Sequence, residues 1–174
     1  MAKAKKRDPH PAEELAKLEA ALAKGALGRA YVFRGEERYF RERATDLVVR
    51  RATERGLDMC RHDVLDPEFD LARLLDDLVA GALFATARCV VIQRADSLIK
   101  KGARKFAPGV IAAIQARLSS DDEGVLVLTA DNLRADHVLV KAVAAAEGTG
   151  MVCRRLWDTP PPWAPDPRRA ELVL

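Results

Sequence analysis

The order of apolar and polar positions along the chain predicts helices that alternate with strands. Compact apolar runs predict five strands, over residues 30–35, 59–64, 89–93, 124–130 and 150–155. Apolar residues at helical spacing predict five helices, near residues 15–24, 36–55, 71–80, 108–118 and 138–147. Glycines that follow four of these helices are expected to end them: Gly25, Gly56, Gly81 and Gly148.

This alternation predicts the fold class. Strands that alternate with helices of ten or more residues are expected to pair in parallel, because a crossover helix is needed to join parallel neighbours. The sequence therefore predicts a three-layer α/β domain, with a mostly parallel five-stranded sheet and helices on both faces. We place this domain at residues 12–157, after a flexible basic terminus at 1–11. Residues 158–167 are expected to form a proline-rich linker, and 168–174 to begin a truncated second domain.

Composition and charge exclude several broad classes. The 174 residues carry a formal net charge of +3, which is too small to identify nucleic acid as a partner. The chain has no apolar run of membrane-spanning length, and its basic start lacks the apolar segment of a secretory signal. Cys60, Cys89 and Cys153 are odd in number and each falls in a predicted strand. We therefore expect reduced core thiols in a cytoplasmic protein, without a membrane or a metal site.

The turn after the first predicted strand is where such a sheet would bind a nucleotide. A phosphate-binding loop needs glycines, whose backbone amides surround the phosphates, and then a Lys-Ser/Thr pair. Alignment of Gly35 with the first glycine places Phe40, Arg41 and Glu42 at the second glycine, the lysine and the hydroxyl position. Two glutamates directly after Gly35 add negative charge in the expected first helical turn, where a phosphate would lie. This turn is therefore expected to bind no ATP.

The third strand agrees with this interpretation. A hydrolysing site would place acidic residues after its apolar run to hold magnesium, and here Gln93 and Arg94 follow instead. The pattern favours a nucleotide-binding architecture without its nucleotide site, although an α/β fold that never bound nucleotide remains an alternative. Four other pairs are interpreted as surface, strand-edge, helix-face or turn residues without catalytic geometry: His62–Asp63, Asp76–Asp77, Asp121–Asp122 and Asp136–His137. We expect no catalytic residue and no cofactor.

Leu83 and Phe84 are not explained by the core periodicity. Relative to Leu71, a continued helix would turn Phe84 about 220° away from the apolar stripe. If the helix ends at Gly81, both residues lie in a short link before the third strand. A large apolar pair on such a link is a candidate anchor for a hydrophobic pocket on a partner. The alternative, that the pair folds back under the sheet, stays open on patterning alone.

Several of these segments together resemble a known family. They are "GRAYVFRGEERYFRERATDLV", "LLDDLVAGALFATARCVVIQRADSL" and "GVLVLTADNL", followed by an exit that contains proline and tryptophan. In order and spacing they are similar to the delta subunits of the bacterial DNA polymerase III clamp loader, over about residues 12–174. The resemblance implies a P-loop-ATPase-like first domain that does not bind ATP. It also implies docking to the sliding clamp, the beta subunit, through a Leu-Phe pair that matches Leu83 and Phe84. Some relatives begin this motif with Gln, where Val79 stands here.

The resemblance further implies a non-catalytic subunit that binds and opens the clamp so that it can be loaded on DNA. The holoenzyme to which it belongs is a DNA-directed DNA polymerase, a nucleotidyltransferase. Other clamp-loader subunits would be contacted through a C-terminal region beyond Leu174. Primer-template DNA would be contacted within the assembled complex. The chain alone is expected to keep the clamp contact and to lose loader assembly.

Two alternatives from other classes stay open. The first is a nucleotide-dependent enzyme with an atypical phosphate site, which measurable ATP binding would favour. The second is a nucleic-acid-binding α/β module, which strongly salt-dependent DNA affinity would favour. Its candidate residues are basic: Arg50, Arg51, Arg55, Lys100, Lys101, Arg104 and Lys105. We interpret these charges mainly as a solvated helix face and a polar loop.

Overall fold

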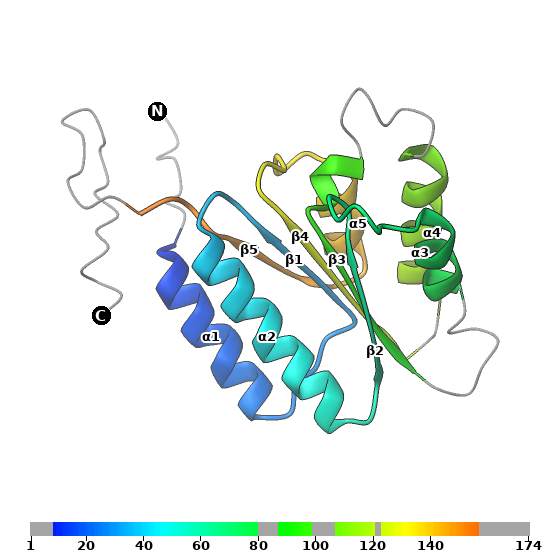
Figure 1. The fold of residues 1–174 in the computed structure, drawn as a ribbon. Coiled ribbons are helices and arrows are strands. Elements are labelled where there is room, and N and C mark those ends of the chain that lie inside the picture. Colours follow the sequence, from blue (N-terminus) through cyan, green and yellow to red (C-terminus); the bar gives the residue numbers. More distant parts are fainter. Residues whose placement is uncertain (1–8, 80–86, 99–106, 121–122, 157–174) are drawn as a thin grey trace.

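The computed structural model describes residues 9–79, 87–98, 107–120 and 123–156. It contains the predicted helices and strands, with ends that differ by a few residues (Figure 1). The linker expected at 158–167 and the second domain expected at 168–174 lie outside the described residues, and so does most of the terminus 1–11. In chain order the elements are α1 (Pro11–Ala23), β1 (Ala30–Arg34), α2 (Arg38–Glu54), β2 (Asp58–Asp63), α3 (Leu71–Val79), β3 (Arg88–Gln93), the 3-10 helix Ala95–Leu98, α4 (Ala107–Ser119), β4 (Val125–Ala130), α5 (Val138–Ala145) and β5 (Thr149–Val152).

The five strands form one sheet in the order β2-β3-β4-β1-β5, and every neighbouring pair is parallel. The predicted fold class is therefore confirmed. Strands β1, β3 and β4 lie at the centre, and all six positions of β4 are buried. A parallel strand covered on both faces needs apolar residues at consecutive positions, which explains the continuous apolar runs in the sequence.

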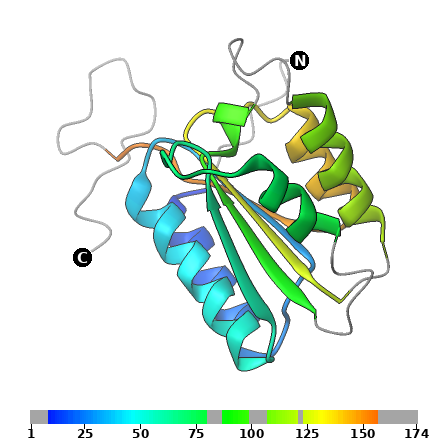
Figure 2. The same ribbon diagram turned by 45° about the vertical axis from the view of Figure 1, so that its right-hand side comes forward.

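Helices cover both faces of the sheet, as Figure 1 and the turned view of Figure 2 show. On one face α1 and α2 pack against alternate strand residues, among them Tyr31, Phe33 and Val127. On the other face α3, α4 and α5 pack against the intervening residues, among them Val32 and Leu128. Successive strand side chains point to opposite faces, so each central strand contributes to both halves of the core.

Two helices end at the glycine that the sequence predicts, and a third ends earlier. Gly25 and Gly56 follow α1 and α2 with φ of +89° and +78°, as a C-terminal glycine cap requires. At α5 the prediction of Gly148 was wrong, because the helix ends at Ala145 and Glu147 adopts the left-handed conformation with φ of 55°. Gly148 is instead needed for close packing, since a Cβ there would lie 2.6 Å from the Ala30 carbonyl oxygen. Gly81 lies outside the described residues.

The three cysteines are free thiols, as predicted, but they differ in position. Cys89 is buried in β3, and Cys60 is half-buried in β2. Cys153 is also buried, although it follows the last residue of β5 and so does not lie in a strand as expected. In the described part of the chain no helix combines the length and apolar character that a membrane span requires.

Burial disfavours the reactive thiolate form of two of these thiols. It raises the pKa of both Cys89 and Cys153 from 9.0 to about 12. At pH 8 the thiolate fraction, and with it the rate of maleimide labelling, is expected to fall about 1,000-fold below that of an exposed thiol. Peptide mapping by mass spectrometry should find Cys60 labelled first and the other two only after denaturant is added. Labelling of Cys89 at the rate of Cys60 in the native chain would contradict this packing.

Candidate functional site

The turn after β1 lies at the carboxyl edge of the sheet, the usual place for a ligand in a parallel α/β fold. Gly35 adopts φ of +131°, a left-handed conformation that L side chains rarely adopt. A Cβ at this position would lie 2.1 Å from the carbonyl oxygen of Cys153. The glycine is thus required by the segment that leaves β5, whose main chain packs directly against the turn.

Backbone hydrogen bonds fill the same turn. The Gly35 amide donates to the Ala130 carbonyl at 3.0 Å, and the Glu37 amide donates to the Cys153 carbonyl at 3.0 Å. In return, the Cys153 amide donates to the Arg34 carbonyl at 2.7 Å. A phosphate-binding loop turns its amides toward the phosphate. Here two of the amides at that place donate to main-chain oxygens of neighbouring segments.

The two glutamates of the turn lie before the helix and not in its first turn, which corrects the sequence-based expectation. Helix α2 begins at Arg38, and Glu37 is its N-cap residue without a side-chain capping bond. The Glu37 carboxylate instead accepts a hydrogen bond from the Leu156 amide at 3.4 Å. The acidic residue therefore also helps to tie the segment after β5 to this turn.

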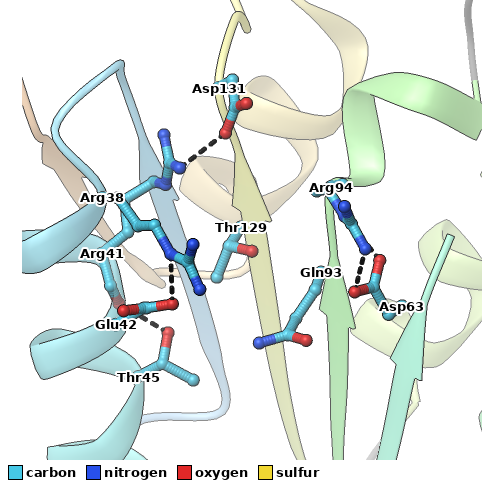
Figure 3. A pocket seen from close by; sticks show the side chains of 9 residues that line it. All are labelled: Arg38, Arg41, Glu42, Thr45, Asp63, Gln93, Arg94, Thr129 and Asp131. Carbon is cyan, nitrogen blue, oxygen red and sulfur yellow. Dashed lines mark hydrogen bonds and ion pairs between the residues drawn. The ribbon is translucent and has the colours of Figure 1, made fainter. Parts of the chain in front are cut away.

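Arg41, at the position of the phosphate-loop lysine, is held inside the protein. The residue is only 9% exposed, and its guanidinium pairs with the Asp131 carboxylate at 2.6 Å and donates to the Gly35 carbonyl. The next residue, Glu42, accepts from Arg38 at 2.6 Å on the surface of the same helix. Figure 3 shows these side chains at the edge of a cavity of about 290 Å³.

The third strand contributes a further ion pair to this cavity. Arg94 directly follows β3 in a left-handed conformation with φ of 56°, and its guanidinium makes a two-pronged contact with the Asp63 carboxylate (Figure 3). This contact raises the pKa of Arg94 above its ordinary value. Asp63 ends β2, so the pair joins the carboxyl ends of two neighbouring strands.

All charged side chains that line the cavity are therefore matched within the protein. Three arginines face three carboxylates, in the pairs Arg38–Glu42, Arg41–Asp131 and Arg94–Asp63. A triphosphate would have to displace carboxylates from these arginines, at the cost of leaving acids unpaired. Across residues 9–79, 87–98, 107–120 and 123–156, no cluster of His, Cys, Asp and Glu could hold a metal ion.

The predicted docking residues, Leu83 and Phe84, lie outside the described residues. The segments on either side of them are described. Helix α3 buries Leu74 and Leu78 against the sheet and ends at Val79, which is 56% exposed. Strand β3 begins at Arg88, at the amino edge of the sheet, whereas the cavity is lined by Asp63 and Gln93, the last residues of β2 and β3.

A buried polar cluster lies beside this connection, and sequence reasoning missed it. His62 and Asp77 were interpreted as a strand-edge or surface residue and a solvated helix residue, but the His62 Nε2 and an Asp77 oxygen are 2.8 Å apart with both side chains largely buried. The other Asp77 oxygen accepts from Arg88 at 2.8 Å. Burial and the nearby Asp77 carboxylate raise the pKa of the Cys60 thiol, which favours its protonated form.

A finer use of helical periodicity would have found Asp77. Relative to the buried Leu74, Asp77 lies about 60° around the helix, at the border of the apolar stripe, whereas Asp76 lies about 200° away. The structure agrees, because Asp77 is half-buried and Asp76 is exposed. The partner could not be found this way, since His62 is on another element.

Other sequence-based interpretations have mixed outcomes. His137 caps α5, with its Nδ1 accepting from the Leu139 amide at 3.2 Å, and Asp136 pairs with Arg134 on the surface. Arg51 pairs with Glu54, and Arg55 donates to the Gly25 carbonyl, so both have structural contacts. The remaining positions lie outside the described residues: Lys100, Lys101, Arg104, Lys105, Asp121 and Asp122.

Comparison with solved structures shows which fold this is. The Bacillus subtilis DNA clamp loader delta protein (YqeN) matches with a TM-score of 0.58 and 20% sequence identity over 82% of this chain. The match covers 43% of that protein, so the chain spans less than half of its length. The domain thus has the same fold as the matched part of that clamp loader delta protein.

A second solved structure, the ORC2 protein of Aeropyrum pernix in ADPNP and ADP complexes, matches with a TM-score of 0.46 and 13% identity. That match covers 83% of this chain and 47% of the other. No protein-family model matches the chain, and the search of the curated proteins found no match.

The filled turn makes Gly35 intolerant of substitution. Gly35→Ala is expected to lower the free energy of unfolding by at least about 2 kcal/mol, because the added Cβ meets the Cys153 carbonyl in a left-handed conformation. Gly56→Ala is the matched control: it also has a positive φ, but its Cβ would meet nothing within 4 Å. That control should cost only about 1 kcal/mol. Urea unfolding of both variants measures the difference, and an equal loss in the two would contradict the contact with Cys153.

Proposed function

We propose that this chain is a non-catalytic clamp-loader subunit of the delta type, which binds the sliding clamp and helps to open it for loading on DNA. The observation that carries most weight is the filled turn after β1 in a clamp-loader-like fold. The turn amides of Gly35 and Glu37 already donate to main-chain carbonyls and are not available to bind phosphate. This fits a subunit that leaves ATP hydrolysis to its partner subunits. The name of the Bacillus subtilis protein supports the same assignment.

The docking residues in this proposal are Leu83 and Phe84. Their support is the family resemblance and the unexplained apolar pair in the sequence, together with the position of the connection at the end of α3. Burying the pair in a cleft of the clamp would contribute about 3–6 kcal/mol. Association costs about 4–15 kcal/mol, so neighbouring contacts must add to the pair. The exposed Val79, at the end of α3, is placed to provide one.

The remaining partners follow from the same proposal. The proposed partners besides the clamp are the other clamp-loader subunits and, within the assembled complex, primer-template DNA. A replication role and free thiols fit a cytoplasmic location. No catalytic residue is assigned to this chain.

Replacing both docking residues tests the assignment. Leu83→Ala combined with Phe84→Ala is expected to weaken binding to the organism's sliding clamp at least about 100-fold, because most of the anchor's apolar burial is lost. The far-UV circular dichroism should not change. Titration calorimetry or surface plasmon resonance measures the dissociation constant.

A second double variant serves as the matched control. Tyr39→Ala with Leu65→Ala also removes one aromatic and one leucine side chain, and these residues are 57% and 55% exposed. They lie in the first turn of α2 and just after β2, toward the carboxyl edge of the sheet. This control should bind the clamp like the parent chain. Undiminished binding by the Leu83 and Phe84 variant would remove the site assignment.

A further inference from the structure

Strand β2 is the last strand at one end of the sheet, so within the described part of the chain its outer side has no strand beside it (Figure 1). On its inner side, the Asp58 amide donates to the Ala87 carbonyl at 3.0 Å, next to β3. In a parallel ladder the main-chain groups of successive residues point to opposite sides. The N–H and C=O groups of Met59 and Arg61 therefore face the outer side of β2, where a further strand could pair with them.

A groove of about 240 Å³ follows this outer side. The consecutive β2 residues 58–62 line it, together with Arg73 and Asp77 of α3. Within this run, Met59 packs on the α1–α2 face of the sheet and Cys60 on the α3–α5 face. Because residues of both faces line the groove, it lies along the outer side of the strand itself, the place that an added strand would occupy.

The positive charges of the groove are not all matched within the protein. Asp77 is already paired with Arg88 at 2.8 Å. Arg73 is exposed and forms no ion pair with a described residue. Arg61 is 48% exposed, and its contact with the Asp46 carboxylate is long, at 3.8 Å. Two arginines in this groove can therefore receive carboxylates from another molecule.

The charge of the groove selects among the possible occupants. A second copy of this chain would bring another Arg61 and Arg73 to the same place, and like charges across a strand pair are destabilising. An extended acidic segment would instead place carboxylates beside both arginines. Exposed ion pairs contribute little each, so the main-chain hydrogen bonds would supply most of the affinity and the arginines the selectivity. Short, charged outer strands also resist unselective pairing, which restricts such a site to a matching partner.

We propose that the outer side of β2 binds an extended, acidic segment of a partner protein as a further strand of the sheet. The segment pairs with the main-chain groups of Met59 and Arg61, and its carboxylates lie beside Arg61 and Arg73. This site goes beyond the proposed clamp contact and is independent of it, because it is formed by β2 and α3 alone.

The probe is the end-blocked heptapeptide Thr-Glu-Val-Thr-Val-Glu-Thr, titrated into the isotope-labelled 174-residue chain and followed by NMR. Saturable shifts of the Met59 and Arg61 amide signals are expected, with a dissociation constant below about 1 mM. A peptide with lysine in place of both glutamates should bind at least about 5-fold more weakly, because its charges meet the two arginines. A peptide N-methylated at its three central amides should not bind, because it cannot donate to the strand. Unshifted Met59 and Arg61 signals at about 5 mM acidic peptide would overturn the proposal.

Substitutions at position 61 separate the main chain from the charge. Arg61→Gln removes only the cation and should weaken binding about 2- to 5-fold. Arg61→Pro also removes the outward amide, which β3 does not use, so the sheet should tolerate it. That variant should bind the acidic peptide at least about 20-fold more weakly than the parent chain. Arg50→Gln is the matched control, because it removes an exposed arginine of α2 outside the groove, and it should leave the affinity unchanged.

Each outcome decides one part of the proposal. Equal affinity of Arg61→Pro and Arg61→Gln would overturn the strand pairing, and equal affinity for the glutamate and lysine peptides would overturn the acidic partner. Should Arg61→Pro not fold, as judged by circular dichroism, the N-methylated peptide decides, and its binding like the parent peptide would overturn the pairing.

Sedimentation of the chain without peptide tests the other occupant. The chain is expected to stay monomeric, whereas a dimer that Arg61→Pro disrupts would assign the outer side of β2 to a second copy and overturn the proposal. None of these measurements uses the sliding clamp. A failure here therefore leaves the proposed function intact, and a failure of clamp binding leaves this site intact.

Discussion

The main-chain contact between the β1 turn and the segment after β5 is the constraint on which the rest of this structure depends. Only glycine fits at position 35, because the Cys153 carbonyl occupies the space that a Cβ would need. The amides of Gly35 and Glu37 donate hydrogen bonds to the carbonyls of Ala130 and Cys153. In parallel α/β folds that bind nucleotides, phosphates lie at the turn after the first strand. The sheet gains an anchored edge strand, and the turn's hydrogen-bonding capacity is used within the protein.

The two edges of the sheet consequently differ in character. At the carboxyl edge, paired arginines and carboxylates surround a cavity whose charges balance, as in Arg41–Asp131 and Arg94–Asp63. At the amino edge, Asp77 of α3 and Arg88, the first residue of β3, form an ion pair whose side chains are largely buried. The carboxyl edge therefore matches its own charges, and the amino edge has a polar cluster that is largely shielded from water.

The sequence predicted the sheet better than it predicted the polar contacts, for a physical reason. Continuous apolar runs such as 125–130 reflect burial on both faces, a property of neighbouring residues that a single sequence records. The sequence also predicted that the turn at Gly35 lacks a phosphate-binding loop, because the residues of such a loop are close together in the sequence. The His62–Asp77 contact was not, since it joins two elements whose relative position only the fold determines. The end of α5 was also not predictable: the left-handed residue there is Glu147, and Gly148 packs closely against Ala30.

The central proposal is that this domain binds the sliding clamp without using a nucleotide. The most direct test is the dissociation constant of the chain with the clamp, measured by calorimetry in the absence and in the presence of millimolar Mg-ATP, with Mg-ATP titrated into the chain alone as a reference. The account predicts one and the same dissociation constant in both conditions and no binding heat in the reference titration. An affinity that changes with Mg-ATP, together with saturable heat from the chain alone, would contradict it.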